Sequence, residues 1–239
     1  MIHISIKPEI VFHFLGFPVT NSLITSTSIV IVFFILSVYF YYASMSGHSK
    51  LVFFVRFLIS KLYDLFKPIS KEKTDELFPF FASLFLFIIL SNWLGLFPGV
   101  GSIIIREGTE TIPLLRGSTA DLNTTLGLGL TAFVLIQFYG FKFLGFNYLK
   151  KFISLGNPIA FFTGILEIIS EFSKIISFAF RLFGNIFAGE VLITVVAFLI
   201  PALASFPFLV LEIFVGFIQA LVFSMLAAVF ISVATAEHH

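Results

Sequence analysis

An apolar run that begins at Pro158 has no helix-ending signal before Pro201, and it limits the architectures open to this chain. Read as one helix, the 43 residues 158–200 span roughly 64 Å, about twice the ~30 Å hydrocarbon core of a bilayer. The run also contains Arg181, whose guanidinium stays charged and costs about 2.5 to 17 kcal/mol to place in hydrocarbon. Such a helix must be broken, strongly tilted or nearly in the membrane plane, and its arginine must face protein or water.

Composition places the rest of the chain in the membrane as well. Of the 239 residues, 59% are hydrophobic and 11% are charged, and the mean hydropathy is +1.09, whereas soluble domains carry roughly 25% charged residues. The net charge of +1 gives no nucleic-acid signal. Without cysteine there is no disulfide framework, thiolate nucleophile or Cys-based metal site. We expect a single membrane domain over residues 1–239, with no cofactor and no metal.

The spacing of apolar segments predicts an all-α integral membrane protein with five membrane crossings and an interfacial amphipathic helix. The amphipathic helix is indicated by Lys50, Arg56, Lys61, Asp64 and Lys67, which interrupt apolar residues at near-helical spacing. The predicted segments are an outer N-terminal segment at 1–22, spans at 23–43, 78–96 and 122–144, the interfacial helix at 47–70, an outer loop at 99–121, a long tilted helix at 158–200 and a last helix at 207–234.

Two local patterns refine this layout. Within the outer loop, residues 103–105 and 112–115 are short apolar runs typical of a small hairpin. Asn157 followed by Pro158 is a favourable helix start, with Asn as N-cap and Pro at the first helical position. The two long C-terminal segments are joined by a short proline-bounded turn, so we expect them to form a tilted hairpin.

Lysine and arginine are unevenly distributed between the two sides of this layout. Nine of them lie in residues 50–73 and 142–151, whereas only Lys7, Arg106 and Arg116 fall on the other side. The positive-inside rule therefore predicts an outer N-terminus and a cytoplasmic C-terminus, which agrees with five crossings.

A polar stripe follows one face of the long helix. Glu167, Lys174 and Arg181 are spaced by seven residues and drift only about 20° per step, so they share a face that also includes Ser177 and either Gly184 or Asn185. Glu190 lies nine residues beyond Arg181, about 180° around the helix, and belongs to a separate environment.

The last helix carries a matching pair. Glu212 and Gln219 share a face, with Gly216 between them allowing close backbone approach. An antiparallel hairpin brings Gln219 toward the level of Arg181.

Simpler explanations apply to several of these residues. Lys174 and Glu167 also suit snorkelling to an interface, Gln219 suits an interhelical hydrogen bond, and Asp121 with Asn123 suits a helix cap. For the whole chain, two alternatives stay open: a secondary transporter that binds an anion at Arg181, and a scaffold in which Arg181 is paired and inert. The chain has no internal repeat of the kind many transporters show, and no GxxxxGK[ST] phosphate loop.

The segment RLFGNIFAGE, from Arg181 to Glu190, resembles subunit a of F-type ATP synthases when taken with the downstream LEIFVGFIQALVF, which contains Glu212 and Gln219. The segments SNWLGLFPG (91–99) and TADLNTTLGLGL (119–130) support the resemblance, which extends from about residue 33 to residue 239. It implies a non-catalytic, ion-translocating subunit with the long hairpin against a ring of c subunits. Further implied partners are b-type peripheral stalk subunits, the rest of the complex, the lipid bilayer and protons, with Na⁺ as the alternative ion.

The resemblance also implies residue roles. Arg181 is the stator arginine that faces a membrane-embedded carboxylate on each c subunit, flanked by two offset aqueous half-channels. The outer half-channel would contain Glu190, Glu212, Gln219, Asn185 and Asn123, and the inner one would contain Ser177, Lys174 and Glu167. A bacterial inner membrane is the expected location, with an organelle inner membrane as the alternative.

Two positions depart from the family pattern. Relatives commonly pair an acid with a histidine at the positions of Glu190 and Glu212, which are both glutamate here. Gly95 stands where some relatives have an acid, and we expect Asp121 to substitute for it.

Overall fold

The structure is a computed structural model that describes residues 7–45, 50–97, 104–107, 110–152, 158–200 and 205–236. Its long elements are helices, namely α1 (Asn21–Met45), α2 (Lys50–Ser70), α3 (Thr74–Leu96), α4 (Leu122–Leu144), α5 (Pro158–Leu199) and α6 (Ser205–Ala234). Short 3₁₀ turns are η1 (Lys71–Lys73), η3 (Ser118–Ala120) and η4 (Gly145–Lys151). Five helical segments of the described chain are long and apolar enough to cross a membrane, with α2 and α3 counted as one. This confirms the predicted all-α membrane fold; the interfacial position of α2 stays a prediction.

Two short hairpins accompany the helices. β3 (Ile104–Glu107) pairs antiparallel with β4 (Glu110–Pro113), within the loop where the sequence predicts a hairpin. β1 (Ile10–Phe14) pairs with β2 (Phe17–Thr20), and this hairpin was not predicted. Its two turn residues, Leu15 and Gly16, have φ values of 51° and 86°, the left-handed conformations that two-residue hairpin turns require.

Local capping explains where the third crossing begins. α4 occupies the residues predicted for that span, and the Asp121 side chain accepts a hydrogen bond from the Asn123 backbone N–H at 2.9 Å. A carboxylate at this position satisfies one of the backbone donors that the first helical turn leaves free. The predicted N-cap of α5, Asn157, lies outside the described residues.

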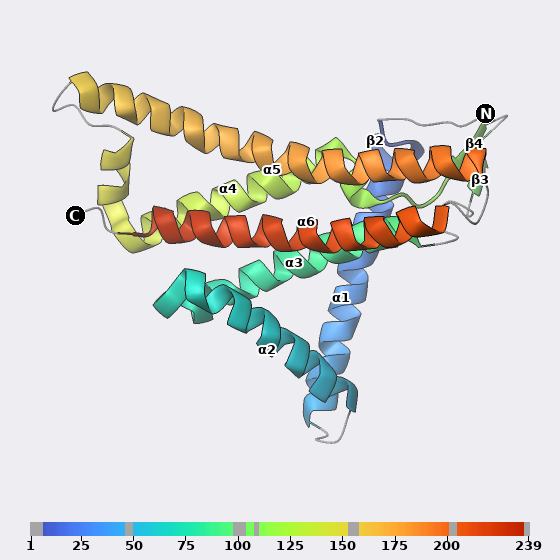
Figure 1. Cartoon of the computed structure of the whole chain (residues 1–239), viewed down its shortest axis with the longest axis horizontal. Coiled ribbons are helices and arrows are strands. Elements are labelled where there is room, and N and C mark those ends of the chain that lie inside the picture. Colours follow the sequence, from blue (N-terminus) through green and yellow to red (C-terminus); the bar gives the residue numbers. More distant parts are fainter. Residues whose placement is uncertain are drawn as a thin grey trace.

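The helix α5 is continuous for 42 residues, roughly 63 Å, and contains no proline after its first position. A helix of that length is about twice as long as the hydrocarbon core is thick. The structure thus has the predicted long helix unbroken, and its tilt in the membrane stays a prediction. α6 runs antiparallel beside it, and α3 and α4 pack against this pair (Figure 1).

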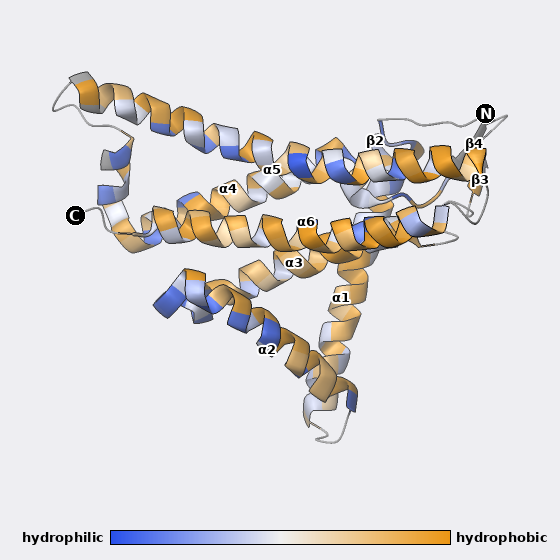
Figure 2. Cartoon of the chain, viewed as in Figure 1, coloured by the Kyte–Doolittle hydropathy of each residue, from blue (hydrophilic) through white to orange (hydrophobic). Residues whose placement is uncertain are grey.

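The core lies where these four helices meet. Phe81 and Ile88 of α3, Leu182 of α5 and Phe223 and Ile231 of α6 are all fully buried or nearly so. By contrast, α1 leaves the bundle after its first turns (Figure 1), and its buried residues all lie between Asn21 and Ile29. The remaining helix surfaces are mainly apolar (Figure 2), as contact with lipid requires.

Candidate functional site

Arg181 lies on the exposed surface of α5, on a helix that is otherwise apolar enough to span a membrane. Its Nη2 donates a hydrogen bond to Ser177 Oγ at 3.3 Å. Among the described residues, no carboxylate forms an ion pair with it. A guanidinium at membrane depth requires an anion or water, so this face needs something that the described chain does not supply.

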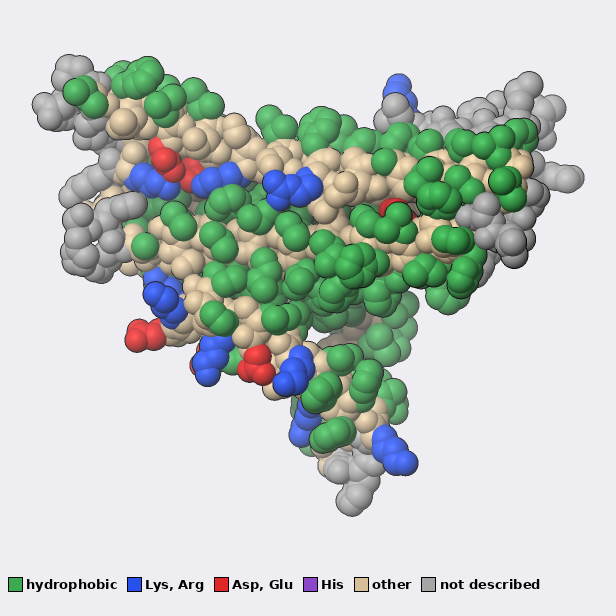
Figure 3. Space-filling model, in the orientation of Figure 1, with side chains coloured by type: hydrophobic (Ala, Val, Ile, Leu, Met, Phe, Trp, Pro, Cys, Tyr) green, Lys and Arg blue, Asp and Glu red, His purple; other side chains and the backbone are tan. Residues whose placement is uncertain are grey.

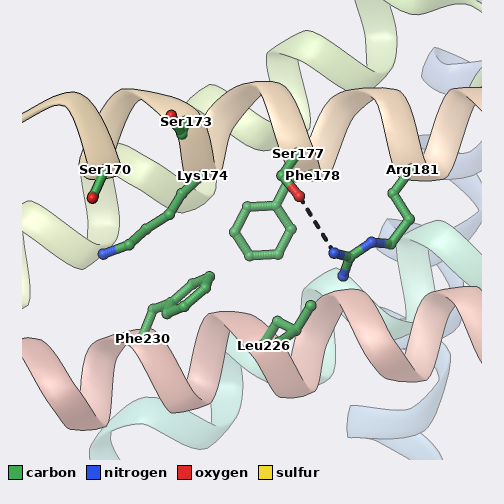
Figure 4. Close-up of a pocket in the computed structure, with 8 residues that line it drawn as sticks. All are labelled: Ser170, Ser173, Lys174, Ser177, Phe178, Arg181, Leu226 and Phe230. Atoms are coloured by element: carbon green, nitrogen blue, oxygen red, sulfur yellow. Dashed lines mark hydrogen bonds between the residues drawn. The ribbon is translucent and has the colours of Figure 1, made fainter.

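A hollow of about 280 Å³ opens beside Arg181, toward the start of α5. We call it the serine pocket; it is lined by Ser170, Ser173, Lys174, Ser177, Phe178 and Arg181 of α5 and by Leu226 and Phe230 of α6. Figure 4 shows the Lys174 and Arg181 side chains extending from α5 toward α6, with Phe178 between them. Charged side chains gather along the seam between α5 and α6 in the left half of Figure 3. The predicted grouping of Lys174, Ser177 and Arg181 is therefore present in one pocket.

Glu167 shares the face of this stripe but does not line the serine pocket. Its carboxylate instead pairs with Lys151 Nζ of η4 at 2.6 Å. Its predicted role in the inner half-channel stays a prediction.

A second hollow, of about 220 Å³, lies further along α5. We call it the glutamate pocket; its lining includes Asn92, Gly95, Gly117, Ile186, Glu190 and Thr194. Glu190 Oε2 lies 3.4 Å from Arg116 Nη2, and the Glu190 side chain is 42% exposed while that of Arg116 is 10% exposed. The two pockets use separate stretches of α5, since Ile186 follows Arg181 by five residues, roughly 7.5 Å of helix.

Polar residues of α6 meet α5 along the stretch from Arg181 to Glu190. Asn185 Nδ2 donates to Gln219 Oε1 at 2.9 Å, which joins the two helices one turn beyond Arg181. The buried carboxyl of Glu212 packs against Gly189, where an added Cβ would overlap it. Within the described chain, Glu212 Oε1 and Gln219 Nε2 are buried and have no hydrogen-bond partner. Buried polar atoms of this kind are sites where water binds or protons exchange.

Asp121 and Asn123 lie at a different place. The buried Asp121 carboxylate accepts hydrogen bonds from Ser22 Oγ at 2.6 Å and from Asn123 Nδ2 at 3.2 Å, besides the backbone bond of the cap. It thus ties α1 to the start of α4. Neither pocket is lined by either residue, and the role of Asn123 in ion passage stays a prediction.

A comparison with known protein families bears on this arrangement. The model of the family described as ATP synthase A chain matches residues 22–232. The chain belongs to this family. It is therefore an integral, multi-pass subunit of the membrane sector of ATP synthase and associates with the rest of that complex. The matched range of this A chain contains both pockets and leaves the β1–β2 hairpin outside.

Three residues of the A chain contribute to the site without having been predicted. Glu171 is buried beside Lys174, Arg116 contacts Glu190, and Asn92 binds the backbone of α6. Only Glu171 carries a signal in the sequence, as an acid in an apolar helix three residues before Lys174. Among the described residues, no group of three His, Cys, Asp or Glu side chains is arranged to hold a metal ion.

Proposed function

We propose that this A chain is the stator subunit that conducts protons, with Na⁺ as the alternative ion, past a ring of c subunits and couples that flow to rotation and ATP synthesis. One observation carries the proposal: Arg181 is exposed on an apolar helix, has no ion pair within the described chain, and lines the end of the serine pocket nearest the glutamate pocket. The family membership supplies the complex in which a partner surface is available.

The chemistry of arginine suits this role. A fixed cation favours the ionised form of a carboxylate that approaches it, so a ring carboxylate would release its proton on arriving at Arg181. The guanidinium does not lose its own proton at physiological pH, so it cannot pass one directly between the two pockets. A proton can then cross only by travelling with the ring.

The two pockets would act as the ends of offset half-channels. We assign the glutamate pocket, with Glu190 and the neighbouring Glu212, Gln219 and Asn185, to the outer path. We assign the serine pocket, with Ser177 and Lys174, to the inner path, with Glu167 near its entrance. The C-terminus would lie in the cytoplasm, and the membrane would be a bacterial inner membrane.

Replacing Arg181 by alanine in the assembled complex tests the proposal. We expect ATP-driven proton pumping by reconstituted vesicles to fall to background, because the ring carboxylate loses the cation that discharges it. Glu76→Gln is the control, since Glu76 forms an exposed ion pair with Lys142 at 2.6 Å and lines neither pocket. Pumping at the parental rate by Arg181→Ala would contradict the stator role and would favour a transporter or a scaffold.

Replacing Glu190 by glutamine tests the outer path. The amide keeps the size of the side chain and can still accept a hydrogen bond from Arg116, but it cannot carry a proton. We expect proton flow to slow by roughly tenfold or more, with the normal amount of A chain in the purified complex. If the variant fails to assemble, Glu190 is structural instead.

A further inference from the structure

Glu171 is a buried carboxylate on α5 that the proposed function does not use. Its residue is 3% exposed, and three side chains hold it. Oε1 accepts a hydrogen bond from Lys174 Nζ at 2.7 Å and lies 3.5 Å from Lys151 Nζ, while Oε2 accepts from Gln137 Nε2 at 3.0 Å. A buried charge with this many partners is held in one position.

Two of the three partners of Glu171 come from other elements, and Lys174 is on the same helix. Gln137 of α4 accepts in turn from the Tyr148 hydroxyl of η4 at 2.9 Å. Lys151, also of η4, pairs with Glu167. The cluster thus contains two carboxylates and two ammonium groups, and its formal charges balance.

Lys174 is the member of the cluster that reaches the serine pocket. Its Nζ lies 4.8 Å from the centre of the Phe230 ring, which forms the opposite wall on α6. Glu171 itself does not line the pocket, and it bears on the pocket through Lys174. The Glu171 carboxylate, 2.7 Å away, largely offsets the electric field of the Lys174 ammonium group. Both groups are shielded from bulk solvent, since the Glu171 side chain is 4% exposed and that of Lys174 is 19% exposed.

We propose that Glu171 is a positioning residue for ion passage through the serine pocket, which it serves by holding Lys174 in the pocket wall and cancelling its charge. This inference rests on the proposed function, because it assumes that protons use this pocket. Without the carboxylate, an uncompensated ammonium group would join Arg181 in the same hollow. Added positive charge raises the free energy of a proton there and favours the ionised form of any carboxylate that must be loaded from this side.

The pH dependence of loading depends on every charged or titratable group around Glu171. Among the described side chains, these groups are Lys174 and Glu167 on α5 and Tyr148 and Lys151 on η4, while α4 contributes the neutral Gln137 and α6 contributes the Phe230 ring that faces Lys174. Removing the Glu171 charge leaves the described cluster with one excess positive charge. The pH optimum for proton uptake from the serine-pocket side therefore moves to lower pH.

The test compares variants of the whole complex in vesicles whose ATP-hydrolysing side faces the medium, so that the pH on the serine-pocket side is controlled. Glu171→Gln keeps the shape and the hydrogen-bonding oxygen. We expect it to slow ATP-driven pumping by roughly three- to tenfold and to shift the pH profile toward acid. The double variant Glu171→Gln with Lys174→Met removes the excess charge, so it should pump faster than Glu171→Gln and show a smaller shift. Glu76→Gln, a charge removal in an exposed pair, should leave the pH profile unshifted.

Three results would overturn the inference. One is a parental rate and pH profile in Glu171→Gln. Another is slow pumping that the added Lys174→Met change does not relieve. That result would give Glu171 a structural role, in which it links α4, η4 and α5. Failure of the isosteric Glu171→Gln to assemble would likewise make it structural. Arg181→Ala in the same vesicles separates the two proposals, because normal pumping in that variant removes the stator role whatever the Glu171 variants do.

Discussion

Gly189 gives the carboxyl of Glu212 its place between α5 and α6. An added Cβ at Gly189 would overlap that carboxyl, and Glu212 is 6% exposed. The glycine therefore serves as a space for a side chain of the neighbouring helix. The close approach that glycine allows between membrane helices also brings the Glu212 carboxyl beside the backbone of α5. The next residue of α5 after Gly189 is Glu190.

Replacing Gly189 by alanine should displace the Glu212 carboxyl. We expect passive proton conductance through the membrane sector to fall by roughly tenfold and the A chain to lose about 1 to 3 kcal/mol of stability from overpacking. Gly127→Ala on α4 is the matched control, because a Cβ there meets no atom within 4 Å and alanine favours the helix. Equal conductance in the two variants would show that the Glu212 position is not critical.

Some residues of the site could be predicted from the sequence and others could not. Heptad spacing brought Lys174, Ser177 and Arg181 onto one face, and the structure has them in one pocket. The same spacing passed over Glu171, since its partners Gln137 and Lys151 lie 34 and 20 residues away in the chain. The contact of Arg116 with Glu190 spans 74 residues and depends on how the loop before α4 packs, which no local pattern specifies.

At the scale of elements, side chains of α3 fix the position of α6. Asn92 Nδ2 donates to the Gly216 carbonyl at 2.9 Å, and Trp93 Nε1 donates to the Ile213 carbonyl at 3.0 Å. Asn92 Oδ1 also accepts from Thr119 Oγ1 at 2.7 Å, so one buried amide joins α3, α6 and η3. These bonds hold the turn of α6 that lies between Glu212 and Gln219.

Replacing Asn92 by leucine should loosen that attachment. The change leaves the Thr119 hydroxyl without its acceptor and removes a bond to α6, which costs about 1 to 3 kcal/mol. The expected result is a lower temperature for loss of the A chain from the detergent-solubilised complex. Ser83→Ala on the same helix is the control, because the hydrogen bond of Ser83 within the described chain stays on its own helix, at the Pro79 carbonyl. A change no larger than that of the control would contradict the role assigned to Asn92.

The helices could be predicted wherever the length of an apolar segment determines the structure. The five apolar segments follow from the requirement to cover about 30 Å of hydrocarbon with a hydrogen-bonded backbone. The greater length of α5 follows from the lack of a helix-ending signal between Pro158 and Pro201. The β1–β2 hairpin was missed because its strands have five and four residues and Gly16 is its single turn signal. The long tilted helix predicted at 158–200 is present as the continuous α5, and its tilt in the membrane stays a prediction because no membrane boundary fixes its angle.

For the whole molecule, the two pockets should be reached by water from opposite sides of the membrane. The chain contains no cysteine, so an introduced cysteine is the one thiol that this chain offers to a reagent. Ser173→Cys in the serine pocket should react with a membrane-impermeant thiol reagent from the cytoplasmic side, and Thr194→Cys in the glutamate pocket from the other.

Labelling oriented vesicles from one side at a time measures from which side of the membrane each cysteine is reached. Phe138→Cys is the control, because Phe138 is an exposed α4 residue that lines neither pocket and should face lipid, where an ionic reagent does not reach. Labelling of both pocket cysteines from the same side would contradict two offset half-channels.

The unbroken course of α5 has a mechanical consequence. Both pockets and Arg181 are carried by one hydrogen-bonded helix without an internal proline, so the spacing between them is set by its rise of about 1.5 Å per residue. Such a helix resists extension along its axis, because lengthening it would break backbone hydrogen bonds. The distance along the helix between Arg181 and Glu190, nine residues or roughly 13.5 Å, therefore cannot change without breaking backbone hydrogen bonds of α5.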